Sequence, residues 1–198
     1  MTNLIRPLSP RCRLLSSALA GLARGVVSTR AADTPAEPPA QTSFKFDFGA
    51  KAAPGYTAVT PATVYSKESG YGFDLGTAPS AVARGGADPL HDGFVTSAKP
   101  FFFSVNVPEG NYRVTVTLGD AQADSVTTVK SESRRLMLER VRTPAGKFET
   151  RTFIANVRNA KVPPPPLNAP GNDHVGLNNR EDGPNGLVLH WDDKLTLE

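Results

Sequence analysis

The chain has 198 residues, with 22 lysines and arginines against 19 aspartates and glutamates and a sequence pI of about 9.1. Five arginines lie in residues 1–32, where no acidic residue occurs, so the rest of the chain is slightly acidic. It lacks a basic run interleaved with aromatic residues, which argues against nucleic-acid binding. The length suits one domain with a tail.

The first 32 residues have the composition of a targeting leader. They combine arginines with a short apolar stretch, Leu14–Ala23, and with small residues at Ala31 and Ala32. This pattern predicts a signal peptide and a secreted or periplasmic protein. Arg24 interrupts the apolar region, so an organelle-type presequence or a mis-assigned start codon stays open. The stretch is shorter than the roughly 20 residues of a membrane span, and we expect no membrane contact.

The single cysteine, Cys12, lies inside this leader. The mature protein is therefore expected to contain no disulfide and no cysteine metal site, so its stability must come from packing. Residues 33–43 are rich in proline and have little to bury, which predicts a linker before the folded domain.

From residue 44 onward, apolar residues alternate with polar ones as in β-strands. In the clearest stretch, Phe101–Val107 and Tyr112–Leu118 each place apolar residues on one face, and a Pro-Glu-Gly-Asn turn joins them. We interpret this stretch as a hairpin. Further strands are expected at 44–48, 63–66, 71–75, 94–96, 126–130, 135–141 and 148–157, with a last hairpin of 187–191 and 194–198 around Asp192-Asp193.

Two segments lack this alternation. Residues 76–93 are predicted to form an exposed loop, and residues 159–186, rich in Pro and Asn, a flexible insertion. About ten short strands without βαβ alternation predict an all-β fold over residues 44–198, an antiparallel two-sheet sandwich of the jelly-roll type. Because the last strand forms just at Glu198, we expect a truncated module of a longer polypeptide.

Residues that could carry catalysis do not form a recognisable pattern. Gly119-Asp120 follows a strand as in a Gly-Asp-Ser-Leu esterase, but the next residue is Ala121, which has no nucleophile. Asp88, His91 and Asp92 have a spacing that could hold a metal, although the glycines around them favour a plain loop. No catalytic residue is predicted.

Aromatic side chains offer the better candidates for a binding site. Tyr56, Tyr65 and Tyr71 lie in the loop-rich first third of the domain, and Trp191 lies at the tip of the last hairpin. Each could stack on a sugar ring, which has an apolar face. Each could instead fill the core while its polar tip finds a partner, and for Tyr71 and Trp191 we favour that role.

Several segments resemble one known family when they are taken in order. They are Phe44–Gly49, Pro54–Thr57, Val64–Glu68, Gly70–Phe73, the stretch ending at Gly119-Asp120, Glu132–Glu139 and His190–Glu198. Together they are similar to the amino-terminal galactose-binding-like domain of bacterial rhamnogalacturonan acetylesterases and related β-agarase-type proteins. The resemblance covers residues 44–198 apart from the insertion.

The resemblance implies a non-catalytic role. In that family the sandwich precedes a Gly-Asp-Ser-Leu esterase domain that deacetylates pectic polysaccharide, and this chain carries no such domain. It implies a carbohydrate-binding-type module whose partners are the missing esterase domain and a pectic or other galactose-containing polysaccharide. The alternative is a structural accessory domain that packs on the esterase and binds no sugar. Related sandwiches hold a structural calcium, for which Asp47 and Glu198 would be the ligands; no other cofactor is implied.

Overall fold

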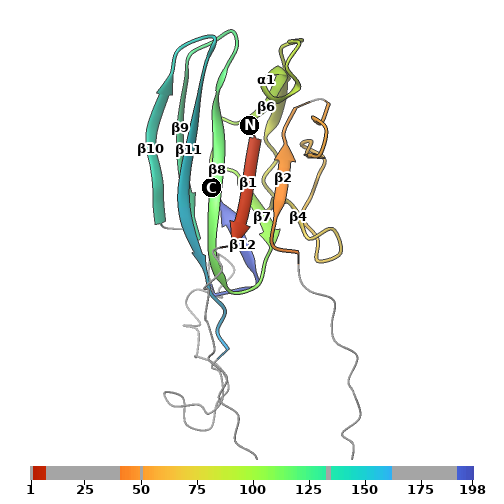
Figure 1. Ribbon diagram of the computed structural model, residues 1–198, viewed down its shortest axis with the longest axis vertical. Helices are drawn as coiled ribbons and strands as arrows, with labels where there is room; N and C mark the ends of the chain where they lie inside the picture. Colours follow the sequence, from red (N-terminus) through yellow and green to blue (C-terminus); the bar gives the residue numbers. More distant parts are fainter. Residues whose placement is uncertain (1, 8–40, 50, 133–134, 162–190) are drawn as a thin grey trace, which may run out of the picture.

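The computed structural model describes residues 2–7, 41–49, 51–132, 135–161 and 191–198. These residues form two five-stranded sheets that pack face to face (Figure 1). The all-β, antiparallel two-sheet sandwich expected from the alternation is therefore confirmed. Residues 8–40, which hold most of the predicted leader and linker, and residues 162–190, which hold most of the predicted insertion, lie outside the described residues.

Nearly all neighbouring strands are antiparallel. Sheet A has the order β11 (Lys147–Val157), β8 (Gly110–Asp120), β1 (Thr2–Pro7), β2 (Phe44–Asp47), β3 (Thr57–Ala58), with β2 and β3 parallel. Sheet B has the order β10 (Arg135–Thr143), β9 (Ser125–Ser131), β12 (Lys194–Leu197), β7 (Phe102–Asn106), β4 (Tyr71–Asp74). A small third sheet pairs β5 (Ser80–Ala83) with β6 (Gly93–Thr96), and the short helix α1 (Pro89–Asp92) precedes β6.

The core lies between the inner faces of the two sheets. Val114, Val116 and Leu118 of β8 are buried there, as are Phe103 and Val105 of β7. Phenylalanine rings from both sheets meet edge to face: the Phe103 centroid lies 5.1 Å from those of Phe46 and Phe48, at interplanar angles of 76° and 74°. Such contacts add to the gain from burying apolar area.

The predicted hairpin of residues 101–118 is wrong in its pairing, although both strands exist. β7 belongs to sheet B and β8 to sheet A, so the turn after Asn106 crosses from one sheet to the other. A hairpin within one sheet and two strands in facing sheets show the same alternation, because a strand with one buried face has a period of two whichever strand it pairs with. The apolar faces of β7 and β8 meet across the core.

The region predicted as an exposed loop, residues 76–93, contains β5 and α1. The small residues of β5 leave it mostly exposed, so no alternation marks it in the sequence. The side chain of Arg84 links this region to sheet A: its guanidinium donates two hydrogen bonds to the carboxylate of Asp120 on β8. Within the described residues, α1 is too short to cross a membrane, and no other helix there could do so.

Strand β1 comes from the segment predicted to be a leader. Thr2–Pro7 pairs antiparallel with β2 on one side and with β8 on the other. Removal of residues 1–32 by a signal peptidase would leave these two neighbours without this partner. A molecule that has lost residues 1–32 during export therefore cannot contain β1 in sheet A.

Candidate functional site

The outer face of sheet B carries a cluster of polar side chains. Strands alternate their side chains, so residues next to core positions such as Phe73, Phe103 and Leu195 point to the opposite face. Asp74, Ser104 and Lys194 reach that face from β4, β7 and β12 respectively. Together with the residues that contact them they form what we call the Tyr65 cluster: Tyr65, Asp74, Ser104, Asn106, Asp192, Lys194 and Thr196.

An ion pair lies at the centre of the Tyr65 cluster. Lys194 Nζ is 2.7 Å from Asp74 Oδ2, and Ser104 Oγ donates to the same oxygen at 2.8 Å. Asp192 Oδ2 lies 3.8 Å from the ammonium group. The side chains of Asp74 and Lys194 are mostly buried, so this pair is screened less by solvent than a surface pair.

The environment shifts the pKa values of these groups in directions that keep the pair charged. Burial alone would raise the pKa of Asp74, but hydrogen bonds from Lys194 and Ser104 outweigh it and hold the pKa below its usual value. Burial would lower the pKa of Lys194, whereas the hydrogen bond and charge of Asp74 raise it. For Asp192, burial dominates and raises the pKa.

Tyr65 combines an aromatic ring with hydrogen-bonding groups. Its hydroxyl donates to Asn106 Oδ1 at 2.6 Å, and Lys194 Nζ lies 4.8 Å from the ring centroid, within the range of a cation–π contact. Burial raises the pKa of the Tyr65 hydroxyl. A ring beside an amide, a carboxylate and an ammonium group provides both an apolar face and donors and acceptors for hydroxyl groups.

A buried acid adjoins the cluster and was not predicted. Glu132 follows β9 with a positive φ of 50° and is 3% exposed. Its Oε1 accepts from Thr196 N at 3.0 Å, and its Oε2 has no hydrogen-bond partner among the described residues. Burial raises the pKa of Glu132 to about 7. No sequence pattern marks this residue, because its burial depends on how β9 and β12 meet.

The four predicted aromatic residues have different surroundings. Tyr71 packs on the buried ring of Phe46 at 5.0 Å, which fits the core role. Tyr56 is half-buried beneath the ammonium group of Lys45, 5.5 Å from its ring centroid. Trp191 is half-buried with a positive φ of 72° and forms a bridge with Asn159. Within the described part of the chain, no aromatic contact joins two of the four, and Tyr65 alone of them belongs to the cluster.

The two residues named for calcium already have partners. The carboxylate of Asp47 is fully buried and accepts from the backbone N–H groups of Gly49 at 2.8 Å and Ala53 at 2.9 Å. Glu198 Oε1 pairs with Lys130 Nζ at 2.6 Å. Calcium at Asp47 and Glu198 stays a prediction, and the ion would compete with these contacts. No three His, Cys, Asp or Glu side chains gather as a metal site in the described ranges.

The loop acids near α1 have a structural explanation. Asp88 caps α1 by accepting from Leu90 N at 3.0 Å, and its other oxygen lies 2.6 Å from His91 Nδ1. The hydrogen bond with His91 lowers the pKa of Asp88. The His91 ring also packs on Phe148 at 4.1 Å.

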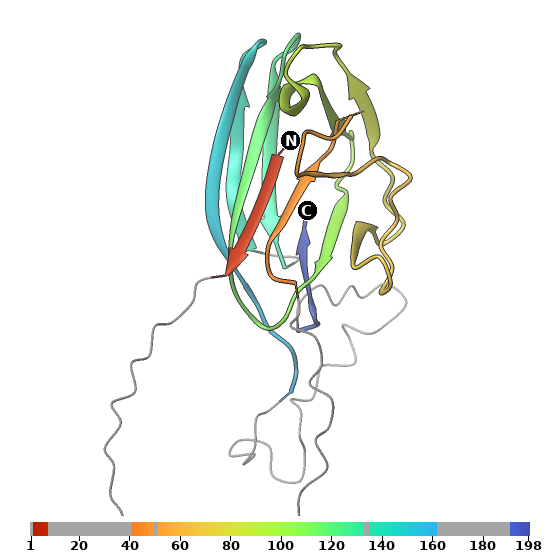
Figure 2. The same ribbon diagram turned by 45° about the vertical axis from the view of Figure 1, so that its right-hand side comes forward.

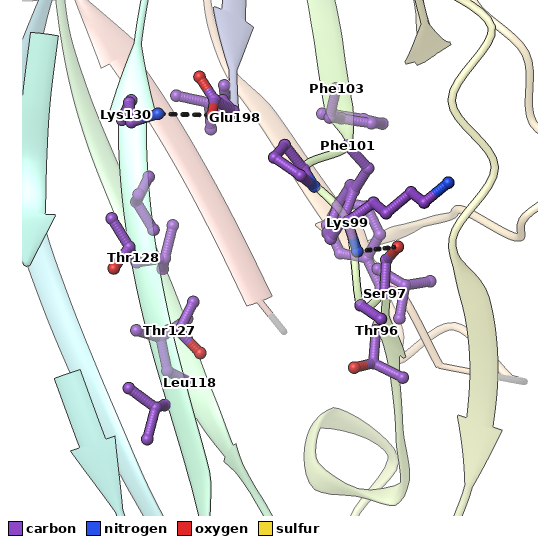
Figure 3. Close-up of a pocket in the computed structure, with 18 residues that line it drawn as sticks. Thr96, Ser97, Lys99, Phe101, Phe103, Leu118, Thr127, Thr128, Lys130 and Glu198 are labelled. Carbon is purple, nitrogen blue, oxygen red and sulfur yellow. Dashed lines mark hydrogen bonds and ion pairs between the residues drawn. The ribbon is translucent and has the colours of Figure 1, made fainter. Parts of the chain in front are cut away.

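A cavity of about 450 Å³ lies away from the predicted aromatic residues. Its floor is part of the core, formed by Phe48, Val95, Phe103, Val116 and Leu118. Figure 3 shows its two sides: β9 with Thr127 and Thr128, and the segment that runs from Thr96 to Phe103. No sequence pattern predicted this cavity, because its lining residues come from segments that lie far apart in the chain.

Comparison with known proteins identifies the sandwich. The model of the family described as "Beta-agarase/YXIM esterase-like, galactose-binding domain-like" matches residues 44–137. Over these residues, slightly less than half of the chain, the sequence is similar to that family. The galactose-binding-like domain is a module and not a catalytic domain.

Two longer proteins are similar to this chain over part of their length. Beta-agarase A of Zobellia galactanivorans is 28% identical over 128 residues, which are 61% of this chain and 23% of that protein. The crystal structure of protein YXIM of Bacillus subtilis matches with 21% identity and a TM-score of 0.44, covering 78% of this chain and 39% of that one. The chain thus spans well under half the length of both proteins.

Proposed function

We propose that this galactose-binding-like domain is a non-catalytic carbohydrate-binding module of a polysaccharide-degrading protein of the rhamnogalacturonan acetylesterase type. Its ligand would be a pectic or other galactose-containing polysaccharide. Support comes from the family match over residues 44–137 and from the relative named as a β-agarase. A secreted or periplasmic location is part of this proposal, and export with cleavage of residues 1–32 would then remove β1 from sheet A.

The observation that carries the proposal is the Tyr65 cluster. A sugar presents ring carbons and hydroxyl groups, so its recognition needs an aromatic surface beside fixed donors and acceptors. Tyr65 provides the ring, and Asn106 and the Asp74–Lys194 pair provide polar atoms held by hydrogen bonds at 2.6 to 2.8 Å. Groups held in this way lose little conformational freedom on binding.

The test compares Tyr65 with Tyr71 by affinity electrophoresis in gels containing rhamnogalacturonan, galactan or agarose. Tyr65→Ala should abolish the retardation while lowering the Tm by only a few degrees, because the side chain is half-buried and lies outside the core. Tyr71→Ala, the matched control, should lower the Tm by more, since it leaves a cavity against Phe46. Tyr65→Phe keeps the ring and should retain most of the binding.

Two results would count against the Tyr65 cluster as a sugar site. Unchanged retardation of a folded Tyr65→Ala variant would place any glycan site elsewhere. If the wild-type chain migrates freely in every gel, the result favours the alternative function, a structural accessory domain that packs on an esterase domain.

We also infer that the chain has no esterase activity of its own. A serine hydrolase needs a histidine base that contacts a hydroxyl nucleophile. Among the described residues, His91 contacts Asp88 and Phe148, and no serine or threonine hydroxyl hydrogen-bonds to its ring. Hydrolysis of 4-nitrophenyl acetate or of acetylated rhamnogalacturonan should equal that of a His91→Ala variant and the buffer blank. Turnover that vanishes in that variant would overturn the inference.

A further inference from the structure

The outer face of sheet B continues from the Tyr65 cluster to the opposite edge of the sheet. The cluster lies on β4, β7 and β12, and Figure 2 shows β12 (blue) beside β7. β9 and β10 follow in the strand order, and β10 forms the edge of the sandwich at the left of Figure 1. β10 carries three arginines against one glutamate, whereas the chain beyond residue 32 is slightly acidic. The positive charge of this edge is therefore local.

The pairing of β9 with β10 shows which of their side chains share this outer face. Val129 of β9 is buried against the core, so Val126 and Lys130, three positions and one position away, point to the outer face. Directly opposed residues of neighbouring strands point the same way. Arg142, opposite Val126, and Leu136, opposite Lys130, therefore lie on the outer face too. We define the β10 face by six residues: Val126, Thr128, Lys130, Leu136, Arg140 and Arg142.

A β-bulge brings Arg140 to the β10 face. The register with β9 shifts between Leu138 and Val141, so two residues of β10 lie opposite Thr128. One is Glu139, the single acid of this strand, and the other is Arg140, with a positive φ of 47°. The N–H of Arg140 donates to the Thr128 hydroxyl at 3.2 Å. Bulges redirect side chains and are frequent beside functional sites.

The two arginines of the β10 face have no acidic partner among the described residues. Lys130 pairs with Glu198 at 2.6 Å, so its charge is compensated. Arg140 and Arg142 are exposed, and neither takes part in an ion pair within the described ranges. An arginine presents a planar fork of N–H donors that fits the two oxygens of a carboxylate. The β10 face therefore offers two positions for carboxylate groups.

Apolar side chains lie in the same face as these arginines. Val126 and Leu136 are each 53% exposed, although most apolar side chains of the sandwich are buried. A pyranose ring presents C–H groups that can contact such aliphatic side chains. β9 and β10 contain no aromatic residue, so the bases of a nucleic acid would find no ring to stack on here. Carboxylates attached to sugar rings thus fit the β10 face better than phosphates attached to nucleosides.

We propose that the β10 face binds the uronic acid units of an acidic polysaccharide, with their carboxylates on Arg140 and Arg142. This inference rests on the proposed function, because it names the class of sugar that the module selects. The Tyr65 cluster does not explain such a preference, since Asp74 neutralises Lys194 there at 2.7 Å. The two sites lie on one face of sheet B, so one polymer chain could contact both.

The test compares an acidic with a neutral ligand of the same length. Fluorescein-labelled oligogalacturonate and oligogalactan are titrated with the full chain, and fluorescence anisotropy gives the two Kd values. Oligogalacturonate should bind more tightly in about 0.01 M salt, and its advantage should shrink in about 0.1 M salt, where the Debye length falls from about 30 to about 10 Å. The variant Arg140→Gln/Arg142→Gln should weaken oligogalacturonate binding about three- to tenfold and leave oligogalactan binding unchanged.

A second double variant provides the matched control. Lys45→Gln/Arg113→Gln removes two positive charges from exposed positions on the outer face of sheet A, so it changes the net charge equally. It should bind oligogalacturonate as the wild type does. Both double variants change exposed side chains and should keep the wild-type Tm, which checks that they fold. Equal losses of oligogalacturonate affinity in the two folded variants would attribute the effect to net charge and refute the β10 face.

Further ligands separate this inference from other kinds of anion binding and from the proposed function. Poly-glutamate carries carboxylates without sugar rings, and a DNA duplex carries phosphates. If either binds the wild type as tightly as oligogalacturonate in about 0.1 M salt, the β10 face recognises charge alone and the proposal fails. Binding of oligogalactan with no preference for oligogalacturonate would refute only the β10 face. Binding of oligogalacturonate alone, lost in Arg140→Gln/Arg142→Gln, would support the β10 face and count against the Tyr65 cluster.

Discussion

Replacing Gly72 with alanine is expected to lower the free energy of unfolding by at least about 3 kcal/mol. A Cβ atom at Gly72 would lie 2.4 Å from Tyr65 N, 2.5 Å from Val64 C and 2.8 Å from Thr63 O, all of them backbone atoms. The φ angle of Gly72, +148°, is also one that residues with a side chain rarely adopt. Backbone cannot rotate away as a side chain does, so one of the two segments must move.

The segment that would move is the one that carries Tyr65. It is held against β4 by the bonds Tyr65 N to Phe73 O at 2.9 Å and Phe73 N to Thr63 O at 2.8 Å. Gly72→Ala should therefore weaken the Tyr65–Asn106 contact as well as the fold. Urea denaturation measures the loss of stability, and gel retardation by glycan measures the effect on the Tyr65 cluster.

Gly76→Ala is the matched control for Gly72→Ala. Gly76 also has a positive φ, +67°, but a Cβ atom at this residue would meet nothing within 4 Å, so only the backbone cost of about 1 kcal/mol applies. If Gly72→Ala were no less stable than Gly76→Ala, the close approach of residues 63–65 to β4 would be disproved.

Replacing Glu132 with glutamine should flatten the pH dependence of stability between about pH 4.5 and 7. The pKa of Glu132 rises from an ordinary 4.5 to about 7 because of burial. Within this window the unfolded chain has released the proton and the folded chain still holds it, so the free energy of unfolding falls as the pH rises. The full loss is on the order of 3 kcal/mol, since one pKa unit corresponds to about 1.4 kcal/mol.

Glutamine keeps an oxygen for Thr196 N and carries no charge at any pH. Glu132→Gln should therefore match the wild type near pH 4.5 and exceed its stability at pH 8, as measured by urea denaturation at several pH values. Glu139→Gln, an exposed change on β10, should leave the wild-type curve in place. The opposite trend, a wild-type stability that rises from pH 5 to 8 and a variant that follows it, would refute the raised pKa.

The acid side of the same curve reports on another group. The pKa of Asp74 is held below its usual value, chiefly because hydrogen bonds from Lys194 and Ser104 outweigh burial. The contribution of Asp74 to the free energy of unfolding is present above the pKa that this carboxyl has in the unfolded chain. It is lost as the pH falls through the lower pKa of the folded chain. This decline below about pH 4 should persist in Glu132→Gln, so the two groups are separable in one titration.

The alternation of apolar and polar residues was enough to predict the all-β fold class and the longer buried strands. Apolar residues at every second position mark the buried faces of β7 and β8, because successive side chains on a strand point alternately into the core and into solvent. The short strands that are mostly exposed, such as β5, leave no such trace. The core position of Tyr71 could also be predicted, since Tyr71 and Phe73 are two residues apart and lie on the same face of β4.

Strand pairing and the contacts between distant side chains could not be predicted from the sequence pattern. Backbone hydrogen bonds are alike for every partner strand, so alternation could not tell that β7 and β8 belong to different sheets. The Tyr65 cluster joins Asp74 to Lys194, which is 120 residues away in the chain. The burial of Glu132 likewise depends on where β12 meets β9, and no local sequence pattern predicts this contact.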